Sequence, residues 1–579
     1  MARKAKAQDS FDAVSLGILW DRLISLTDEI VSTLVRTSFS TIVSESYDLS
    51  CVVLDADANS IAQGTMSIPV FIGSAPVTAR HMLNKFPPET LKPGDVIFTN
   101  DPWLGTGHLF DVTMMRPVFR DGRIVAYTIS ITHLPDIGGT GFGSAATEIY
   151  QEGLRFPIAK ISEAGRIDER LIEIVRANVR VPEQVVGDLM ANVACNEVGG
   201  RQVLEFMDEY GLDDLAPLSR AIREQSERAM REKIRGLKPG VYKHRIDLEG
   251  LDSPIRFAVA VEVKGDSIHV DFDGTGPCVR AGINVPFCYA HAMSLYSIKT
   301  LTLPGIPNNA GMAAPITVSA PEGCILHAQP PFATGGRHAM GHFVTPLIYG
   351  ALAKAAPDRV QADSGMMNLV TFQGRHRNGR GVSTIYFAAG GYGALDGTDG
   401  ISTVPHPSNM AVVPVEVWET ITSTTIERKE LLADSGGPGK SRGGLGQEVV
   451  VRNDTGQAMT LLGMGNRTQF PARGLFGGGD GSLRVHALDG EPVNAKARVE
   501  LPAGSRVTVR EAGAGGFGNP KRRPVEAVLS DVLDGFVSPK GALRDYGVKV
   551  DLRSGKATRV TAAPKAKAAP KKAAGGGKR

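Results

Sequence analysis

Two short segments of the chain carry a histidine and an aspartate at the same spacing. Asp111 follows His108 by three residues, and Asp136 follows His133 by three residues, each pair in a loop with neighbouring glycines. Imidazole nitrogens and carboxylate oxygens together suit zinc, manganese or iron. Three such ligands with an open position would make a Lewis acid or activate a water molecule. Spacing alone favours the simpler interpretation, in which each pair is only a side-chain hydrogen bond.

The elements that precede these segments would place them at strand ends. Apolar runs predict strands over 96–99 and 123–131, and loops that follow strands commonly carry functional residues. A third acidic segment, with Glu45 and Asp48, stands directly before the apolar run 51–54, which is also typical of a buried strand. The sequence therefore offers three strand ends that could contribute to one site.

The periodicity of the whole chain indicates a mixed α+β fold. Apolar residues recur at helical spacing over 11–39, a second helix is expected over 77–83, and 168–235 forms a helical middle segment. After residue 240 the pattern changes to strands, and 330–520 is rich in glycine, which suits turns and close backbone contacts. We expect a large multi-layer fold whose C-terminal half is rich in strands and glycine.

Four regions follow from these changes in composition. Residues 1–10 form a basic N-terminal tail, and 11–240 form an N-terminal α/β region that holds the candidate metal site. Residues 241–550 form the strand-rich and glycine-rich region. Residues 551–579 are expected to be a disordered tail of lysine, alanine and proline.

The net charge of the 579-residue chain is concentrated in its tails. The formal charge is +3, but residues 1–8 contribute three positive charges and 552–579 contribute nine with no acid. Residues 9–551 therefore carry a net charge of about −9. A basic protein would suggest nucleic acid as a partner, whereas an acidic body with basic tails argues against that partner.

The five cysteines form no C-x-x-C pair, so neither a disulfide framework nor a thiolate zinc site is indicated. The N-terminus carries charges but no apolar run, so we expect no secretory signal, and no apolar run approaches the roughly 18 residues that a membrane span needs. We expect a cytoplasmic protein that does not enter a membrane.

A nucleotide site is not evident in this chain. Gly439-Lys440-Ser441 resembles the end of a phosphate-binding loop, but Asp434 occupies the position of the required first glycine. The segment Gly335-Gly336-Arg337-His338 could hold an anion, although a structural turn is the favoured interpretation.

Five longer motifs resemble those of the hydantoinase B family, and the likeness runs from about Phe11 to Val550. The motifs are Asn100-Asp101-Pro102 with His108-Leu109-x-Asp111, Glu148-Ile149-Tyr150-Gln151-Glu152-Gly153-Leu154-Arg155, Ile283-Asn284-Val285-Pro286, Asp434-Ser435-Gly436-Gly437-Pro438-Gly439 followed by Arg442-Gly443-Gly444-Leu445-Gly446, and Asp545-Tyr546-Gly547-Val548. The family includes ATP-dependent hydantoinases, 5-oxoprolinases and caprolactamases, together with subunits of acetone and acetophenone carboxylases.

The resemblance implies a fold, a site and a partner. It implies a hydantoinase-B-type fold in which His108, Asp111 and His133 bind a divalent metal (zinc, manganese or iron) together with Asp48. Glu45 is the alternative to Asp48. ATP would be bound by a separate A-type subunit, with which this chain forms a hetero-oligomer.

The implied activity is ATP-dependent opening of a cyclic amide, namely a hydantoin, 5-oxoproline or a lactam. Phosphorylation of the amide oxygen makes the carbonyl carbon electrophilic, a metal-activated water attacks it, and Asp48 or Asp136 accepts the proton of that water. The alternative is a subunit of an ATP-dependent ketone carboxylase of the acetone or acetophenone type.

Overall fold

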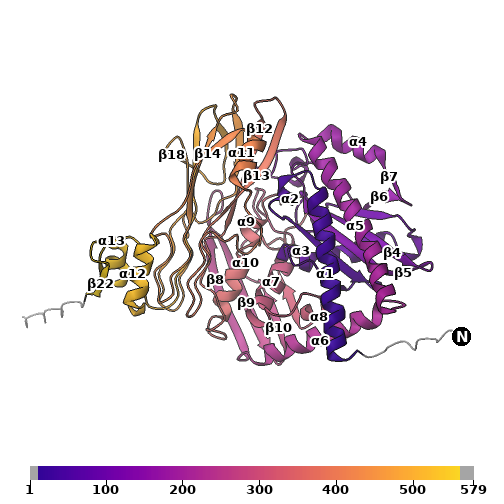
Figure 1. The fold of residues 1–579 in the computed structure, drawn as a ribbon, viewed down its shortest axis with the longest axis horizontal. Coiled ribbons are helices and arrows are strands. Elements are labelled where there is room, and N and C mark those ends of the chain that lie inside the picture. Colours follow the sequence, from indigo (N-terminus) through magenta and orange to yellow (C-terminus); the bar gives the residue numbers. More distant parts are fainter. Residues whose placement is uncertain (1–10, 561–579) are drawn as a thin grey trace, which may run out of the picture.

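A seven-stranded antiparallel sheet lies at the centre of the N-terminal half, in the order β2-β1-β5-β4-β3-β6-β7. The computed structural model describes residues 11–560, and Figure 1 shows this half in indigo and violet. The strands are β1 (Leu49–Asp55), β2 (Ser60–Gln63), β3 (Val96–Thr99), β4 (Asp111–Arg120), β5 (Arg123–His133), β6 (Ala159–Glu163) and β7 (Arg166–Ile167).

Both faces of this sheet are covered. Every residue of β1 is buried, and because successive strand residues point to opposite faces, its side chains enter two different apolar clusters. Cys51 and Val53 pack with the long helices α1 (Ala13–Thr37) and α5 (Pro182–Tyr210), whereas Val52 and Leu54 face the main core. The continuous apolar run predicted for this strand is the consequence of burial on both sides.

The predicted N-terminal helix is confirmed as α1, which begins where the Asp12 carboxylate accepts hydrogen bonds from the backbone N–H groups of Val14 and Ser15. The helix predicted over 77–83 is longer, because α3 spans Pro69–Lys85 and contains Pro76. A proline inside a helix usually ends it, so the sequence pattern indicated a later start.

The helical middle segment is confirmed by α4, α5 and α6, and the mixed α/β class is confirmed by the whole chain. The remaining helices are α2 (Thr41–Ser44), α4 (Glu169–Asn178), α6 (Ala216–Arg235), α7 (Phe287–Thr302), α8 (Ala310–Ala313), α9 (His338–Gly341), α10 (Val344–Leu352), α11 (Val415–Thr422), α12 (Val525–Leu533) and α13 (Pro539–Gly541).

Four further sheets build the C-terminal half, in the orders β11-β10-β9-β8, β13-β12-β16-β19, β14-β15-β20-β17-β18 and β21-β22. Their strands are β8 (Gly240–Leu248), β9 (Ile255–Lys264), β10 (Ser267–Asp271), β11 (Ile316–Ser319), β12 (Met367–Arg375), β13 (Gly381–Ala389), β14 (Thr424–Leu431), β15 (Gln447–Asn453), β16 (Met459–Gly463), β17 (Val485–Leu488), β18 (Glu491–Val493), β19 (Arg498–Leu501), β20 (Arg506–Arg510), β21 (Val548–Asp551) and β22 (Lys556–Arg559).

The two halves share one core. The main apolar cluster joins Phe98 of β3 and Phe110 of the loop before β4 with Phe343 and Leu347 near and within α10, so packing continues across the boundary predicted at residue 240. The predicted start of the C-terminal tail at residue 551 is wrong, because β22 pairs with β21 up to Arg559. Residues 1–10 and 561–579 lie outside the described residues.

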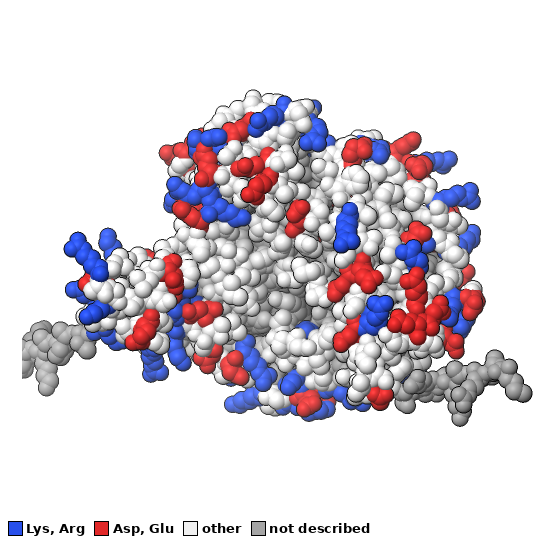
Figure 2. Space-filling model, in the orientation of Figure 1, with Lys and Arg blue, Asp and Glu red and all other residues white. Residues whose placement is uncertain are grey.

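Among residues 11–560, no helix combines the length and apolar character that crossing a membrane requires. On the face drawn in Figure 2, acidic and basic side chains are intermixed over the outer parts of the molecule, and the hollowed centre is largely uncharged.

The hairpin of β4 and β5 positions the candidate site. Its two strands are antiparallel, and the register shifts by one residue at a bulge between Val118 and Phe119. Beyond this bulge the ladder continues to the far end of the hairpin, where Asp111 lies directly opposite His133.

Candidate metal centre

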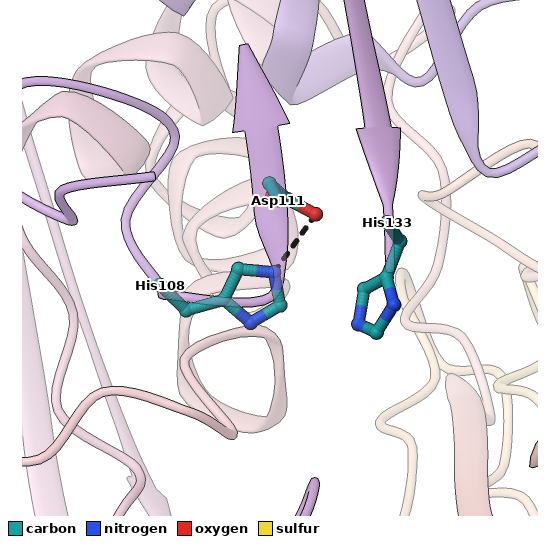
Figure 3. A group of neighbouring side chains, drawn as sticks. All are labelled: His108, Asp111 and His133. Atoms are coloured by element: carbon teal, nitrogen blue, oxygen red, sulfur yellow. Dashed lines mark ion pairs between the residues drawn. The ribbon is translucent and has the colours of Figure 1, made fainter. Parts of the chain in front are cut away.

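Three adjacent strands bring the predicted ligands to one end of the sheet. Directly opposite residues of an antiparallel pair point to the same face, so Asp111 on β4 and His133 on β5 lie side by side. On the other side of β5, strand β1 begins at Leu49, and the backbone N–H of His133 donates to the carbonyl oxygen of Asp48 at 3.2 Å. His108 reaches the same place from the loop before β4 (Figure 3).

The imidazole of His108 is held by the loop at Gly335. Its Nδ1 lies 2.9 Å from the carbonyl oxygen of Gly335, which can only accept, so Nδ1 carries the proton and Nε2 offers a lone pair. Burial and the charge of Arg337 lower the pKa of His108, which favours this neutral form. A histidine metal ligand is typically oriented in this way by a hydrogen bond from its other nitrogen.

The carboxylate of Asp111 is oriented from its opposite side. Its Oδ2 accepts hydrogen bonds from Thr106 Oγ1 at 2.6 Å and from the guanidinium of Arg337. Although burial raises the pKa of Asp111, its contacts with His108 and Arg337 bring it well below the ordinary value, so the group is ionised. Oδ1 is then left to face His108.

Asp111 Oδ1 and His108 Nε2 are 2.9 Å apart, yet neither atom makes a hydrogen bond within the described part of the chain. Two lone-pair atoms at this distance repel each other unless a cation lies between them. Ligand atoms of a tetrahedral zinc site stand roughly 3.3 Å apart when each metal bond is about 2.0 to 2.1 Å. The spacing therefore suits a shared metal ion.

His133 supplies the third donor. Neither of its ring nitrogens has a hydrogen-bond partner among residues 11–560, although the residue is buried. Its ring stacks on Phe110 with centroids 5.4 Å apart and meets Phe142 edge-on at 4.7 Å. Burial, with a smaller contribution from the neighbouring His108, lowers the pKa of His133 to about 3, so it is a neutral imidazole. An unbonded buried imidazole is costly, and a metal bond would remove that cost.

One donor atom from each of His108, Asp111 and His133 lies within 4.8 Å of the others. Two imidazoles and one carboxylate are a donor set that zinc, manganese and iron accept. These three residues are thus the ones in the described chain that could hold such an ion.

Asp48 lines the same small cavity. Burial and the negative charge of Asp111 raise the pKa of Asp48 well above its ordinary value. A cation between the two carboxylates would relieve this repulsion. The assignment of Asp48 as fourth ligand stays a prediction, and its alternative Glu45 is absent from the cavity lining within residues 11–560.

Asp136 is not brought to the cavity. Its Oδ1 accepts from Arg180 Nη1 at 2.6 Å and from the backbone N–H of Gly138 at 3.3 Å, and its Oδ2 accepts from the backbone N–H of Arg180. Both oxygens are therefore used to fix the loop after β5. This placement goes against the proton-accepting role predicted for Asp136.

A distant segment completes the site. Arg337 donates from Nε to the carbonyl of Thr106 at 2.8 Å, and its guanidinium lies 4.6 Å from the ring centroid of Tyr289. Gly107 adopts φ +100°, and a Cβ there would lie 2.8 Å from the Cδ of Arg337, so only glycine fits. The turn predicted at 335–338 is in fact part of the wall around the metal ligands.

Two more histidines lie in this wall. His338 has an Nε2 with no partner in the range 11–560, and His342 Nε2 lies 3.1 Å from the Ser408 hydroxyl. Sequence reasoning missed His342, and it considered His338 only as part of a segment that could hold an anion. The signal was the short run of Arg337, His338 and His342 on one helical turn.

The cavity among these residues has a volume of about 30 Å³. That space suits a metal ion or about one water molecule. It is too small to enclose an organic substrate in addition.

Comparison with known proteins places the chain. The model of the Hydantoinase B/oxoprolinase family matches residues 12–520. The caprolactamase subunit beta of Pseudomonas jessenii is 31% identical over 579 aligned positions, covering 94% of this chain and 97% of that protein. The 5-oxoprolinase of Dictyostelium discoideum is 28% identical over 532 positions, covering 88% of this chain but 40% of that longer protein.

Two solved structures share the fold of this chain. The crystal structure of the ATP-dependent caprolactamase from Pseudomonas jessenii superimposes with a TM-score of 0.87 at 29% identity, covering 94% of this chain and 97% of that one. The nucleotide-free structure of acetone carboxylase gives a TM-score of 0.85 at 18% identity, covering 96% of this chain and 82% of that one, a likeness that shows the fold alone.

Proposed function

Because the chain belongs to the hydantoinase B/oxoprolinase family, we propose that it is the metal-binding B-type subunit of an ATP-dependent enzyme that opens a cyclic amide. The observation that carries this proposal is the pair of unbonded, buried donor atoms 2.9 Å apart on His108 and Asp111, with the unbonded imidazole of His133 beside them. A bound cation would satisfy all of these donor atoms at once.

The metal would be held by His108, Asp111 and His133, with Asp48 as the fourth ligand. When bound, a divalent metal there would supply Lewis acidity toward a carbonyl or a water. The protein's own part is to present neutral imidazoles, to keep Asp111 ionised through Arg337 and Thr106, and to exclude bulk water from a cavity of about 30 Å³.

Asp48 is the residue proposed to accept the proton of the attacking water. Its carboxyl lines the cavity together with His108, Asp111 and His133, so it lies where a base for such a water is needed. Asp136 is left out of this step because Arg180 and Gly138 already bind its oxygens.

ATP would be handled by another chain. The segment that resembles a phosphate-binding loop lacks its first glycine, and the Gly439 backbone packs against Phe517 in the interior of the glycine-rich half. The likeness to the beta subunit of a caprolactamase over nearly the full length supports a division of labour between subunits. We propose an A-type ATP-binding subunit as the partner.

Reconstitution tests the function. The chain is co-expressed with an A-type subunit and assayed for ATP-dependent hydrolysis of hydantoin, 5-oxoproline and caprolactam, and in parallel for carboxylation of acetone or acetophenone with bicarbonate. We expect ATP hydrolysis coupled to ring opening of at least one cyclic amide. Ketone carboxylation without any ring opening would overturn the proposal in favour of the carboxylase alternative.

A further inference from the structure

A second, larger cavity lies beside the metal cavity. It has a volume of about 350 Å³, within the range of small-molecule sites, whereas the metal cavity holds about 30 Å³. Neighbouring residues of the same segments line the two spaces: Pro69 and Asn409 line the larger one, and Val70 and Ser408 line the smaller one. Residues adjacent in the sequence therefore line both spaces at two separate segments of the chain.

The larger cavity carries one positive charge and no negative one. The positive charge is that of Lys299, which lies in the last turn of α7 and is 8% exposed. Among residues 11–560, no aspartate, glutamate or arginine lines this cavity. Its ammonium donates to the carbonyl of Pro304 at 3.1 Å and has no ion pair within the described residues, although an ammonium carries three N–H donors. Burial lowers the pKa of Lys299. A buried cation without a counter-ion favours an anionic ligand.

A neutral hydrogen-bonding group faces the same space. His406 is 6% exposed, and neither of its ring nitrogens has a partner in the part of the chain that the structure describes. Its ring meets Tyr392 edge-on with centroids 5.0 Å apart. Burial lowers the pKa of His406 to about 3, so at neutral pH the imidazole offers one donor and one acceptor. A ring amide offers the complementary pair, a carbonyl acceptor and an N–H donor.

We propose that this cavity binds a compact cyclic amide that bears an oxyanion, with Lys299 pairing with the oxyanion and His406 with the ring amide. This inference rests on the proposed function and narrows its substrate class, because it favours an acidic lactam such as 5-oxoproline over a neutral lactam. The oxyanion has two possible sources, the carboxylate of the substrate or a phosphoryl group added by the partner subunit.

Calorimetry on the purified full chain, without partner or ATP, tests the proposal with three probes: 5-oxoproline, 2-pyrrolidinone and inorganic phosphate. 2-Pyrrolidinone has the same ring without the carboxylate. We expect 5-oxoproline to bind at least about 10-fold more tightly than 2-pyrrolidinone, equivalent to about 1.4 kcal/mol. Lys299→Met should abolish this difference and Lys299→Arg should keep it. Lys354→Met, which removes an exposed charge elsewhere, serves as the matched control.

His406→Leu gives an independent check, because it should weaken both lactams while leaving phosphate binding unchanged. If phosphate binds in a Lys299-dependent way and the carboxylate brings no advantage, the oxyanion site is supported and its source is the phosphoryl group. Binding of all three probes unchanged in Lys299→Met, or of none to the natural chain, overturns the proposal.

The result is separable from the proposed function. Binding at this cavity needs no metal, so added EDTA should leave it unchanged. If a reconstituted enzyme opens lactams but the chain shows no Lys299-dependent binding, only this inference fails. If binding is seen but no cyclic amide is opened, only the proposed function fails.

Discussion

Two buried polar clusters of this chain contain the same kinds of side chain but differ in how fully their atoms are bonded. In the C-terminal half, Arg484 and Glu511 are both fully buried, and Arg484 Nε donates to Glu511 Oε2 at 2.7 Å. Asn368 donates to the other carboxylate oxygen at 2.9 Å, and the remaining guanidinium donors reach backbone carbonyls. In the metal centre, by contrast, His108, Asp111 and His133 leave donor atoms unbonded.

The difference separates a structural cluster from a functional one. Nearly all buried polar groups in native proteins have partners, because an unbonded one costs about 1–3 kcal/mol. The Arg484–Glu511 ion pair obeys this rule through its own side chains and the backbone, and among the side-chain atoms of Arg484, Glu511 and Asn368 only Asn368 Oδ1 has no partner in the described chain. The metal centre would obey it only with a bound ion, so the two clusters should respond differently to mutation and to metal removal.

The largest expected effect is at the metal centre. His133→Ala removes one of three donors, so we expect loss of bound metal and a fall in turnover of the reconstituted enzyme by at least about 1,000-fold, or about 4 kcal/mol. Elemental analysis and the ring-opening assay measure the two quantities. Metal content equal to that of the natural chain would contradict the assignment.

Breaking the other cluster should reduce stability instead. Arg484→Met leaves the Glu511 carboxylate buried without its partner, and we expect the free energy of unfolding to fall by about 3–5 kcal/mol whether or not metal is present. Denaturant unfolding measures this change. The exposed pair of Arg473 and Asp480 provides the control, since Arg473→Met should cost less than about 1 kcal/mol. Equal losses of unfolding free energy in the two variants would show that the buried pair stabilises the chain no more than an exposed one.

A smaller effect is expected from the groups that orient the ligands. Thr106→Val removes the hydroxyl that donates to Asp111 Oδ2 at little change in volume, and metal affinity should fall by about 10-fold. Competition with a chromophoric chelator measures the affinity. Thr113→Val is a matched control on β4, because the Thr113 hydroxyl is buried without a partner in the described chain. Its metal affinity should not change.

The last effect depends on pH and concerns Glu152, whose Oε1 accepts from the backbone N–H groups of Thr334 and Gly335 at 2.8 and 2.6 Å. Burial raises the pKa of Glu152 to about 8, above its ordinary value of 4.5. The folded chain therefore holds this proton more tightly than the unfolded chain. Its stabilising contribution is complete below about pH 4.5 and is lost as pH rises through about 8, at about 1.4 kcal/mol per unit.

Glu152→Gln should remove this dependence of the unfolding free energy on pH. We expect the variant to gain stability relative to the natural chain as pH increases from 5 to 8, because its amide cannot lose a proton. Unfolding free energies at several pH values provide the measurement. Parallel curves for the two proteins would show that Glu152 is not protonated in the folded state.

Much of the site was predictable because its ligands lie at strand ends. The apolar runs before Asn100 and before His133 indicated strands, and the repeated His-x-x-Asp spacing identified the residues. The sequence could not distinguish Asp111 from Asp136, because local spacing is identical. Tertiary contacts separate them: Asp111 faces His133 across a ladder, whereas Asp136 is bound by Arg180 from 44 residues away.

The fold was predictable where burial is one-sided or complete, as in α1 and β1, and less so where tertiary packing overrides local signals. Helix α3 continues through Pro76 because Phe71, Ala75 and Met82 are buried in the core. The second wall of the site could not be found from local pattern, since Arg337 reaches Thr106 across 231 positions of sequence.

The bulge in the β4–β5 hairpin determines whether the site exists at all. Near the turn, Phe119 faces Ile124, and an unbroken continuation of that register would set Thr132 opposite Asp111. A threonine would then stand in the ligand position, and the imidazole of His133 would point to the other face of the sheet. The one additional residue at the bulge thus places His133 directly opposite Asp111 in the β4–β5 pairing. A metal ion present while the hairpin forms would stabilise only the register that includes the bulge. Metal binding would therefore favour correct pairing of β4 with β5 over the shifted alternative.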